Sequence, residues 1–266
     1  MQHFFQSWES FSSDIRAVAH ILLLSDYDGT LTPIVSRPDE AILPSAVRDK
    51  LHALAEKPSL SVGIISGRPL SEVKVMVAVE GIYYAGNHGL EIEGPGLKFV
   101  NPTAKAAKAI IKDLVREFSI KLGSIEGVIE EDKGLGLSIH YRLVKKDEEN
   151  VVADIFHQIT SPLLRQGKIR VSSGKGVWEV GPPIDWHKGN AVETITNEIR
   201  ALLKCKQLLT IYLGDDTTDE DAFRIIHRPE GWSIFIGQDN SSSNADYFLN
   251  STLEVDDFLS RLIELR

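Results

Sequence analysis

Two acidic clusters in this sequence each follow a short, mostly apolar run. Residues 21–24 lead to Asp26 and Asp28, and residues 208–213 lead to Asp215. A buried parallel strand that ends this way delivers its carboxylates to the carboxyl edge of the sheet, where open α/β sheets bind ligands. Converging carboxylates repel one another unless a cation lies between them, and oxygen-only ligands favour a hard ion such as Mg²⁺. The clusters therefore predict metal-assisted chemistry on a phosphate.

The first cluster could supply both a nucleophile and a proton-transfer group. Attack of the Asp26 carboxylate on phosphorus would give an aspartyl-phosphate and divide one difficult hydrolysis into two displacements. Asp28, two residues later, could protonate the leaving oxygen and then activate water. The simpler interpretation of Asp26 and Asp28 is an ordinary turn after a strand, in which the carboxylates bond their own backbone.

The second cluster would complete the metal site. Asp215 could coordinate the ion, and Asp216 and Asp219, nearby in sequence, could be further ligands or could hold the ligands in place. Thr217 or Thr218 could also serve as the N-cap of the helix that carries Asp219, a role compatible with the metal site. Because two such clusters end two strands, an interpretation as turns alone is disfavoured.

Two further positions suit the same site. Ser66, Gly67 and Arg68 follow an apolar run, and a hydroxyl with a backbone turn can hydrogen-bond phosphoryl oxygens. Lys188 could supply the positive charge that a phosphate surrounded by carboxylates needs. Simpler alternatives stay open, since Ser66 could cap a helix and Lys188 could be a solvated loop lysine.

Composition limits the classes of function. The chain has 266 residues, 42% of them hydrophobic, which is enough for one large or two smaller globular domains. Its net charge of −9 argues against binding to nucleic acid or to an anionic membrane surface. The single cysteine, Cys205, cannot form an internal disulfide, and residues 1–13 carry no secretion signal. We therefore expect a cytoplasmic protein.

Strands and helices alternate in the first and last parts of the chain, which predicts a parallel sheet with right-handed crossovers. Strands are expected at residues 21–25, 60–65, 208–213 and 232–236, with a further apolar segment at 83–85. Helices are expected at residues 44–57, 190–203, 219–227 and 253–265, with a short one from residue 69. The fold class is therefore α/β, with a Rossmann-like core made of residues 1–97 and 182–266.

The pattern changes between these two parts, where residues 98–181 predict an inserted α+β domain. The turn at residues 94–96 is a candidate border, and residues 181–183 mark the return. Helices are expected at 103–122 and 147–165, and strands at 127–131, 135–141, 168–171 and 177–180. Leu137 and Ile139 alternate with Ser138 and His140, which is typical of a sheet with one buried and one open face.

The elements around Asp26, Ser66, Lys188 and Asp215, in this order, resemble those of the haloacid dehalogenase-like phosphohydrolases. The resemblance implies a parallel-sheet core of that type, with the inserted domain as a cap between the second and third motifs. It implies Asp26 as nucleophile, Asp28 as general acid and base, Ser66 as a phosphate ligand and Lys188 as stabiliser of the aspartyl-phosphate. Mg²⁺ would be held by Asp26, by the backbone carbonyl of Asp28 and by Asp215.

Longer motifs, spread over almost the whole chain, resemble those of trehalose-phosphate phosphatases. They are Asp-Tyr-Asp-Gly-Thr-Leu-Thr-Pro-Ile at 26–34, Gly-Asn-His-Gly-Leu-Glu at 86–91, Gly-Val-Trp-Glu-Val at 176–180, Ile-Asp-Trp-His-Lys-Gly at 184–189 and Gly-Asp-Asp-Thr-Thr-Asp-Glu-Asp-Ala-Phe at 214–223. The implied activity is hydrolysis of trehalose 6-phosphate to trehalose and phosphate, in trehalose biosynthesis. One departure is Gly181, where members of the family usually have a basic residue.

A disaccharide needs paired polar groups, and the inserted domain offers them on the open face of its sheet. Lys175 and Glu179 flank its last strand, and His140 and Arg142 share the polar face of another. Trp178 alternates to the other face and is expected in the core. Each polar residue here has a simpler alternative as a solvated side chain.

Asn87 and His88, just beyond a core strand, could hydrogen-bond the sugar near its phosphate. A histidine in such a loop more often satisfies a local hydrogen bond, which is the simpler alternative. The two residues are therefore candidate substrate ligands.

Three other functions stay open at this stage. The substrate could be another sugar phosphate, such as sucrose phosphate or a glucosyl-glycerate phosphate. A phospho-accepting receiver module also combines an acidic pocket, a hydroxyl and a lysine, but it gives no reason for the insertion between Ser66 and Lys188. A silent binding protein would not need both Asp26 and Asp28. The expected partner is a small sugar phosphate, with possible functional coupling to a trehalose-phosphate synthase.

Overall fold

The computed structural model describes residues 1–35, 37, 40–174, 176–204, 207–239 and 242–266. Its contacts divide the chain into two compact units. The core unit comprises Met1–Phe99 and Trp186–Arg266, and the inserted unit comprises Val100–Asp185. For comparison, the sequence predicts borders at residues 98 and 181. Hydrophobic side chains form separate buried clusters in the two units.

One sheet runs through the core unit, in the strand order β1-β13-β12-β11-β2-β3-β4-β5-β6. The strands are β1 (Gln2–His3), β2 (His20–Ser25), β3 (Leu60–Ile65), β4 (Tyr83–Gly86), β5 (Glu91–Gly94), β6 (Leu97–Val100), β11 (Leu208–Gly214), β12 (Gly231–Ile236) and β13 (Tyr247–Leu249). The pairs from β1 to β4 are parallel, whereas β5 is antiparallel to β4. Every residue of β2 and β11 is buried, as expected for central parallel strands covered on both faces.

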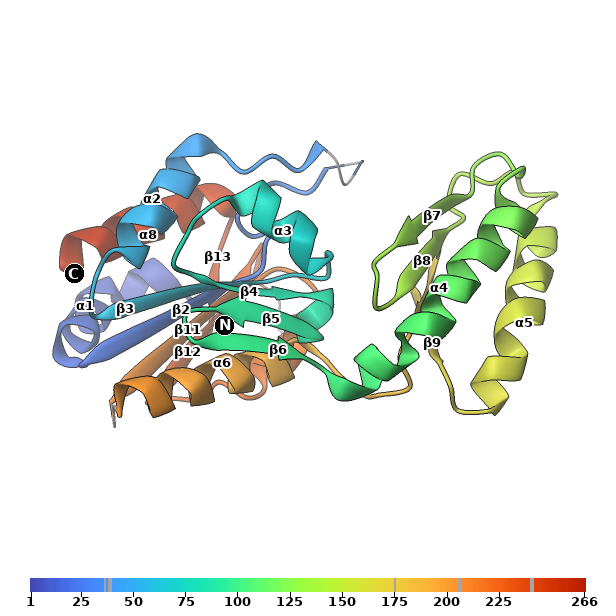
Figure 1. Ribbon diagram of the computed structural model, residues 1–266. Helices are drawn as coiled ribbons and strands as arrows, with labels where there is room; N and C mark the ends of the chain where they lie inside the picture. Colours follow the sequence, from blue (N-terminus) through green and yellow to red (C-terminus); the bar gives the residue numbers. More distant parts are fainter. Residues whose placement is uncertain (36, 38–39, 175, 205–206, 240–241) are drawn as a thin grey trace. The chain divides into compact units, whose positions relative to one another are not determined.

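Helices cover both faces of this sheet (Figure 1). They are α1 (Trp8–Ala17), α2 (Ser45–Ala55), α3 (Leu70–Val77), α6 (Lys188–Leu203), α7 (Glu220–Phe223) and α8 (Thr252–Leu265). Buried side chains of α1, α2, α3 and α8 form one cluster with the sheet, and those of α6 and α7 form a second. This layered arrangement confirms the predicted Rossmann-like α/β core.

Some elements of the core unit differ from the prediction. β1 pairs with β13 from near the other end of the chain, with Gln2 opposite Tyr247, so no local pattern marks it. The turn at residues 94–96, predicted as a border, instead connects the neighbouring strands β5 and β6. The helix expected at 219–227 is shorter, because α7 ends at Phe223.

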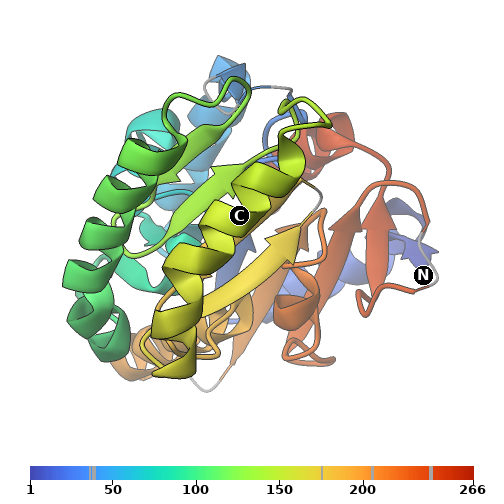
Figure 2. The ribbon, with the colours of Figure 1, turned by 90° about the vertical axis from the view of Figure 1, so that its right-hand side faces the viewer.

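The inserted unit pairs an antiparallel sheet with two helices. The strands β7 (Ile129–Asp132), β8 (Leu137–His140), β9 (Arg170–Gly174) and β10 (Val177–Gly181) lie in the order β7-β8-β10-β9. The helices α4 (Pro102–Leu122) and α5 (Glu149–Arg165) lie side by side over one face of that sheet (Figure 2). Trp178 belongs to this covered face, as predicted, and stacks on Tyr141 and Phe156 at ring distances of 4.0 and 4.5 Å.

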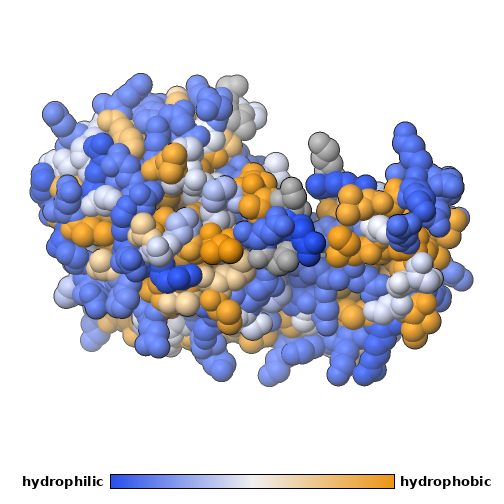
Figure 3. All heavy atoms as spheres, turned by 90° about the horizontal axis from the view of Figure 1, so that it is seen from above, coloured by the Kyte–Doolittle hydropathy of each residue, from blue (hydrophilic) through white to orange (hydrophobic). Residues whose placement is uncertain are grey.

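Hydrophilic side chains cover much of the face drawn in Figure 3, and apolar side chains lie between them in smaller groups. Across the described ranges, no helix combines the length and the apolarity needed to cross a bilayer. Even the 21-residue α4 carries the exposed residues Lys105, Lys108 and Lys112.

Candidate active site

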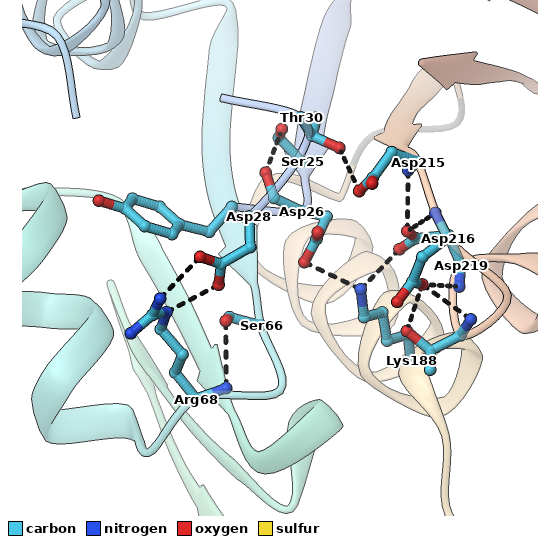
Figure 4. A network of polar contacts seen from close by, with 12 residues as sticks. Ser25, Asp26, Asp28, Thr30, Ser66, Arg68, Lys188, Asp215, Asp216 and Asp219 are labelled. Carbon is cyan, nitrogen blue, oxygen red and sulfur yellow. Dashed lines mark hydrogen bonds and ion pairs between the residues drawn. The ribbon is translucent and has the colours of Figure 1, made fainter. Parts of the chain in front are cut away.

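Four elements of the core unit bring the predicted catalytic residues together (Figure 4). The strands β11, β2 and β3 are adjacent and parallel, so their carboxyl ends meet at one edge of the sheet. Asp215, Asp26 and Ser66 follow these three strands directly, and Lys188 is the first residue of α6. This is the edge at which open α/β sheets bind their ligands.

The carboxylate of Asp26 is held in a buried position. Only 7% of its side chain is exposed, and its Oδ1 lies 2.8 Å from Nζ of Lys188. Its backbone N–H donates to the carbonyl of Leu213 at 2.8 Å, which ties the end of β2 to β11. Burial raises the pKa of Asp26 well above its usual value; Lys188 opposes this, and the charges of Asp219 and Asp215 add to it. Further positive charge would favour the ionised form that a nucleophile needs.

Lys188 is a buried cation between two carboxylates. Its side chain is 2% exposed, and its Nζ lies 2.8 Å from Asp26 and 2.7 Å from Asp219. Burial by itself would lower the pKa of this ammonium group, but the charges of Asp26, Asp219 and Asp216 raise it above its usual value. Lys188 therefore stays charged at the positive end of the α6 dipole, and it is not a solvated loop lysine.

Asp219 is fully buried and accepts four hydrogen bonds. Its Oδ1 accepts from Lys188 at 2.7 Å and from the hydroxyl of Tyr212 at 2.5 Å. Its Oδ2 accepts from the N–H groups of Asp215 and Asp216 at 3.0 and 3.1 Å. These donors occupy the lone pairs of an ionised carboxylate, so Asp219 supports Lys188 and the turn after β11. Tyr212 could not be predicted as part of the site, because it lies within an apolar run that predicts only a strand.

Asp215 lies against the loop that follows β2. The hydroxyl of Thr30, a residue that the sequence analysis did not single out, donates to its Oδ1 at 3.2 Å. A Cβ on Gly29 would lie 2.1 Å from Oδ2 of Asp215, and Gly29 has a φ of 83°, so this approach requires glycine. Burial and the charges of Asp219 and Asp216 raise the pKa of Asp215 to about 7.

A divalent cation suits this cluster of carboxylates. Oxygen atoms of Asp26, Asp215 and Asp219 lie within 4.8 Å of one another, and carboxylate oxygens are preferred ligands of hard divalent ions. Because the lone pairs of Asp219 are already occupied, Asp26 and Asp215 are the carboxylates best able to bind the ion. Burial, with a further contribution from neighbouring carboxylates, raises the pKa of both groups, and a bound cation would favour their ionised forms.

The carboxylate of Asp28 points toward Arg68 (Figure 4). Nε and Nη2 of Arg68 donate to its two oxygens, each at 2.7 Å, and Nη1 of the same side chain pairs with Glu72 on α3. Burial would lower the pKa of Arg68, but Asp28 and Glu72 raise it above its usual value. Arg68, predicted to bind substrate, thus orients Asp28 here, and its contact with substrate stays a prediction.

The loop at Ser66, Gly67 and Arg68 is fixed by the segment that follows β4. Ser66 is 1% exposed, and its hydroxyl accepts from the N–H of Arg68 at 3.1 Å, within the loop itself. The N–H groups of Asn87 and His88 donate to the carbonyls of Arg68 and Ser66 at 2.8 and 2.9 Å. A Cβ on Gly67 would lie 2.9 Å from the His88 ring. The predicted ligands Asn87 and His88 therefore lie beside the predicted phosphate loop.

Asp216 closes the turn before α7. Its Oδ1 accepts from the N–H and the hydroxyl of Thr218 at 2.8 and 2.7 Å. Thr218 does not cap the helix, since Asp219 occupies the N-cap position. Asp216 therefore fixes the shape of this turn, and its support of the metal site stays a prediction.

Polar side-chain contacts cross the open face of the inserted sheet, between β8 and β7 and, past β8, between β10 and the residue that follows β7. Glu179 pairs with Lys133 at 3.1 Å, and His140 pairs with Glu131 at 3.1 Å. No role in the site was predicted for Lys133 or Glu131. The strand register places Glu131 and Glu179 on either side of Ser138.

The remaining predicted positions of this unit differ in their surroundings. Arg142 is exposed just after β8, whereas Ser138, on the polar face, is 1% exposed. Lys175, a predicted ligand, lies outside the described residues. Gly181 ends β10, and a Cβ there would meet open space.

Comparison with known proteins gives a consistent set of similarities. The family model described as trehalose-phosphatase matches residues 24–252. A probable trehalose-phosphate phosphatase D from Arabidopsis thaliana is 34% identical over 92% of this chain and 67% of its own length. A probable trehalose-phosphate phosphatase 4 from Oryza sativa is 32% identical over 92% of this chain and 66% of its own length. The chain thus spans about two thirds of these plant relatives.

Solved structures share the fold. The C-terminal domain of trehalose-6-phosphate phosphatase from C. albicans has a TM-score of 0.75 at 25% identity, with 97% of both chains covered. A haloacid dehalogenase-like hydrolase from Bacteroides thetaiotaomicron has a TM-score of 0.61 at 16% identity, over 91% of this chain and 99% of that one. The second likeness concerns the fold alone.

Proposed function

Because this chain belongs to the trehalose-phosphatase family, we propose that it hydrolyses trehalose 6-phosphate to trehalose and inorganic phosphate. The observation that carries the proposal is the buried Asp26, held 2.8 Å from Lys188, with the half-exposed Asp28 two residues away. One carboxylate is fixed as a nucleophile, and the other, paired with Arg68 through both of its oxygens, stays partly exposed to solvent.

In the first step, the Asp26 carboxylate attacks phosphorus and the bond from phosphorus to the sugar oxygen breaks. Asp28 donates a proton to that oxygen, and trehalose leaves. Lys188 stays within reach of Asp26 and stabilises the negative charge that develops on the phosphoryl group. The hydroxyl of Ser66 and the backbone of its loop hydrogen-bond the phosphoryl oxygens.

In the second step, Asp28 removes a proton from water, and the water oxygen attacks the phosphorus of the aspartyl-phosphate. The bond between phosphorus and Asp26 breaks, so Asp26 returns as a carboxylate and phosphate leaves. A divalent cation, in our proposal Mg²⁺ held by Asp26, Asp215 and the backbone carbonyl of Asp28, offsets the charge of the phosphate when bound.

The sugar is recognised by the polar open face of the inserted unit. Glu179, His140 and Arg142 offer acceptors and donors for hydroxyl groups, and Lys133 and Glu131 extend this set through their ion pairs. Lys175 is kept as a proposed ligand on sequence grounds. Asn87 and His88 would contact the sugar near its phosphate. Such paired polar groups suit a disaccharide, which presents hydroxyls of both donor and acceptor character.

The biological setting follows from the substrate. A trehalose-phosphate synthase would make the molecule that this protein consumes, so the two enzymes would be functionally coupled. A chain with one cysteine suits a reducing compartment such as the cytoplasm.

Phosphate release from a panel of sugar phosphates tests the proposal. Trehalose 6-phosphate should have the highest kcat/KM, and a chelator should stop turnover until Mg²⁺ is restored. Equal or faster turnover of sucrose phosphate or glucosyl-glycerate phosphate would contradict the substrate assignment. Phosphorylation of the protein without repeated turnover would instead support a receiver module.

A further inference from the structure

Tyr212 lies at the middle of β11 with a buried hydroxyl. The whole residue is 0% exposed, and its neighbours Ile211 and Leu213 are apolar and equally buried. Its ring meets that of Phe223 edge-on, with ring centres 5.8 Å apart. A phenylalanine could make the same ring contacts, so packing does not explain the hydroxyl.

The hydroxyl has one partner in a continuous chain of contacts. It donates to Oδ1 of Asp219 at 2.5 Å, the same oxygen that accepts from Lys188 at 2.7 Å. Lys188 in turn lies 2.8 Å from Asp26. Tyr212 therefore lies three contacts away from the carboxylate that we assign as nucleophile.

The sharing of one oxygen determines where the ammonium group can lie. Oδ2 of Asp219 is occupied by two backbone N–H groups, and Tyr212 takes one side of Oδ1. Lys188 can reach Asp219 only from the remaining side, where its Nζ also lies beside Asp26. Without the hydroxyl, Lys188 could move around Oδ1 and away from Asp26.

We propose that Tyr212 is a positioning residue for the phosphatase reaction. Its hydroxyl holds Asp219 so that Lys188 stays beside Asp26. This inference rests on the proposed function. Because Tyr212 is 0% exposed, we expect its effect on the reaction to pass through Asp219 and Lys188 rather than through a contact of its own with substrate.

Tyr212→Phe tests the proposal by removing only the hydroxyl. Because hydrogen bonds to charged groups are strong, kcat for trehalose 6-phosphate should fall by about 10- to 100-fold. The KM should change by less than about twofold, since no substrate contact is removed. 4-Aminophenylalanine at position 212 restores a donor and should recover most of kcat, whereas 4-fluorophenylalanine should not. If the phenylalanine variant does not fold, these two analogues carry the comparison.

Tyr84→Phe is the matched control. Tyr84 is also buried, and its hydroxyl donates to the carbonyl of Val79 at 2.6 Å and accepts from the N–H of Val79 at 3.0 Å, away from the site. Both substitutions remove one buried hydroxyl with a partner, so both should lower stability, but only Tyr212→Phe should lower kcat. Equal kcat in wild type and Tyr212→Phe, or an equal fall in the two variants, would overturn the proposal.

A crystal structure of Tyr212→Phe separates this proposal from the assigned substrate. The distance from Lys188 Nζ to Asp26 should lengthen from 2.8 Å to beyond hydrogen-bonding range, whichever phosphate ester the enzyme hydrolyses. An unchanged distance would contradict the positioning role even if trehalose 6-phosphate is the substrate. Failure of the wild-type protein to hydrolyse trehalose 6-phosphate, with a lengthened distance in the variant, would contradict only the proposed substrate.

Discussion

The buried network around Asp26 in the core unit and the open face of the inserted sheet hold their charged side chains in opposite ways. In the core unit, Asp26, Lys188 and Asp219 are 7%, 2% and 0% exposed, and their contacts are 2.7 to 2.8 Å long. In the inserted unit, Glu179 is 43% and His140 is 36% exposed, and their ion pairs are 3.1 Å long.

This difference indicates that the two units have different roles in the reaction. A buried charge cannot lose its partner without a large loss of stability, so the core network keeps a fixed geometry, as bond-breaking chemistry requires. Partly exposed ion pairs contribute less to stability than buried ones, and their groups can exchange partners with incoming hydroxyls. We therefore expect the core unit to determine whether phosphate is released and the inserted unit to determine from which sugar.

The largest effect is expected for Asp26→Asn. A neutral amide is a poor nucleophile, so phosphate release should fall by more than about 1,000-fold while the fold is retained. Malachite-green assays and thermal unfolding check the two parts of this prediction. The control Asp154→Asn changes an exposed carboxylate on α5 and should leave both unaffected. Near-normal activity of Asp26→Asn would exclude the covalent mechanism.

The second effect concerns Lys188→Met. Removing the cation leaves Asp26 and Asp219 buried without their common partner, which should lower the free energy of unfolding by about 3 to 5 kcal/mol. Activity should be lost as well, and denaturant unfolding of the metal-free protein measures the first change. Lys105→Met, at an exposed position on α4, should change stability by less than about 0.5 kcal/mol. Equal stability of the two variants would mean that the core network is not tightly coupled.

The third effect is smaller and belongs to the inserted unit. Glu179→Gln removes the charge that pairs with Lys133 and weakens a proposed sugar contact, so KM for trehalose 6-phosphate should rise about tenfold. Hydrolysis of p-nitrophenyl phosphate, which has no sugar, should keep its kcat. If both substrates are affected alike, or neither is, the division between the units is wrong.

The last prediction concerns the pH dependence of stability. The pKa of Asp215 is raised from its usual value near 4 to about 7 by burial and by Asp219 and Asp216, so the folded state binds a proton that the unfolded state releases. The free energy of unfolding of the chelator-treated protein should therefore fall as pH rises from about 4 to about 7. Mg²⁺ should raise Tm by a few degrees more at pH 8 than at pH 5, because it replaces that proton. An equal Mg²⁺-induced rise in Tm at pH 5 and pH 8 would contradict this assignment. So would the same pH dependence of the free energy of unfolding in wild type and Asp215→Asn.

Local sequence patterns predicted the residues at strand ends and missed those that depend on register. Asp26, Ser66 and Asp215 could be placed because each follows an apolar run, and adjacent parallel strands align their ends. No role in the site could be assigned to Tyr212, since that role depends on its hydroxyl reaching Asp219 across a turn. Arg68 was predicted to bind substrate, but its pairing with Asp28 requires the packing of two loops that are 40 residues apart.

The same limit applies to the elements. β2 and β11 are continuous buried runs, so their type and position follow from composition. β1 is only two residues long and exists as a strand through its pairing with β13. In the inserted unit, alternation predicted the open face, but the ion pairs of Glu179 with Lys133 and of His140 with Glu131 depend on cross-strand register.

Trapping of the phosphorylated enzyme tests the central claim most directly. The wild-type protein is mixed with trehalose 6-phosphate and Mg²⁺, quenched in acid during turnover, digested and measured by mass spectrometry. The peptide that contains Asp26 should carry the mass of one phosphoryl group, which hydroxylamine should remove. Steady release of trehalose without any label on that peptide would contradict an aspartyl-phosphate at Asp26.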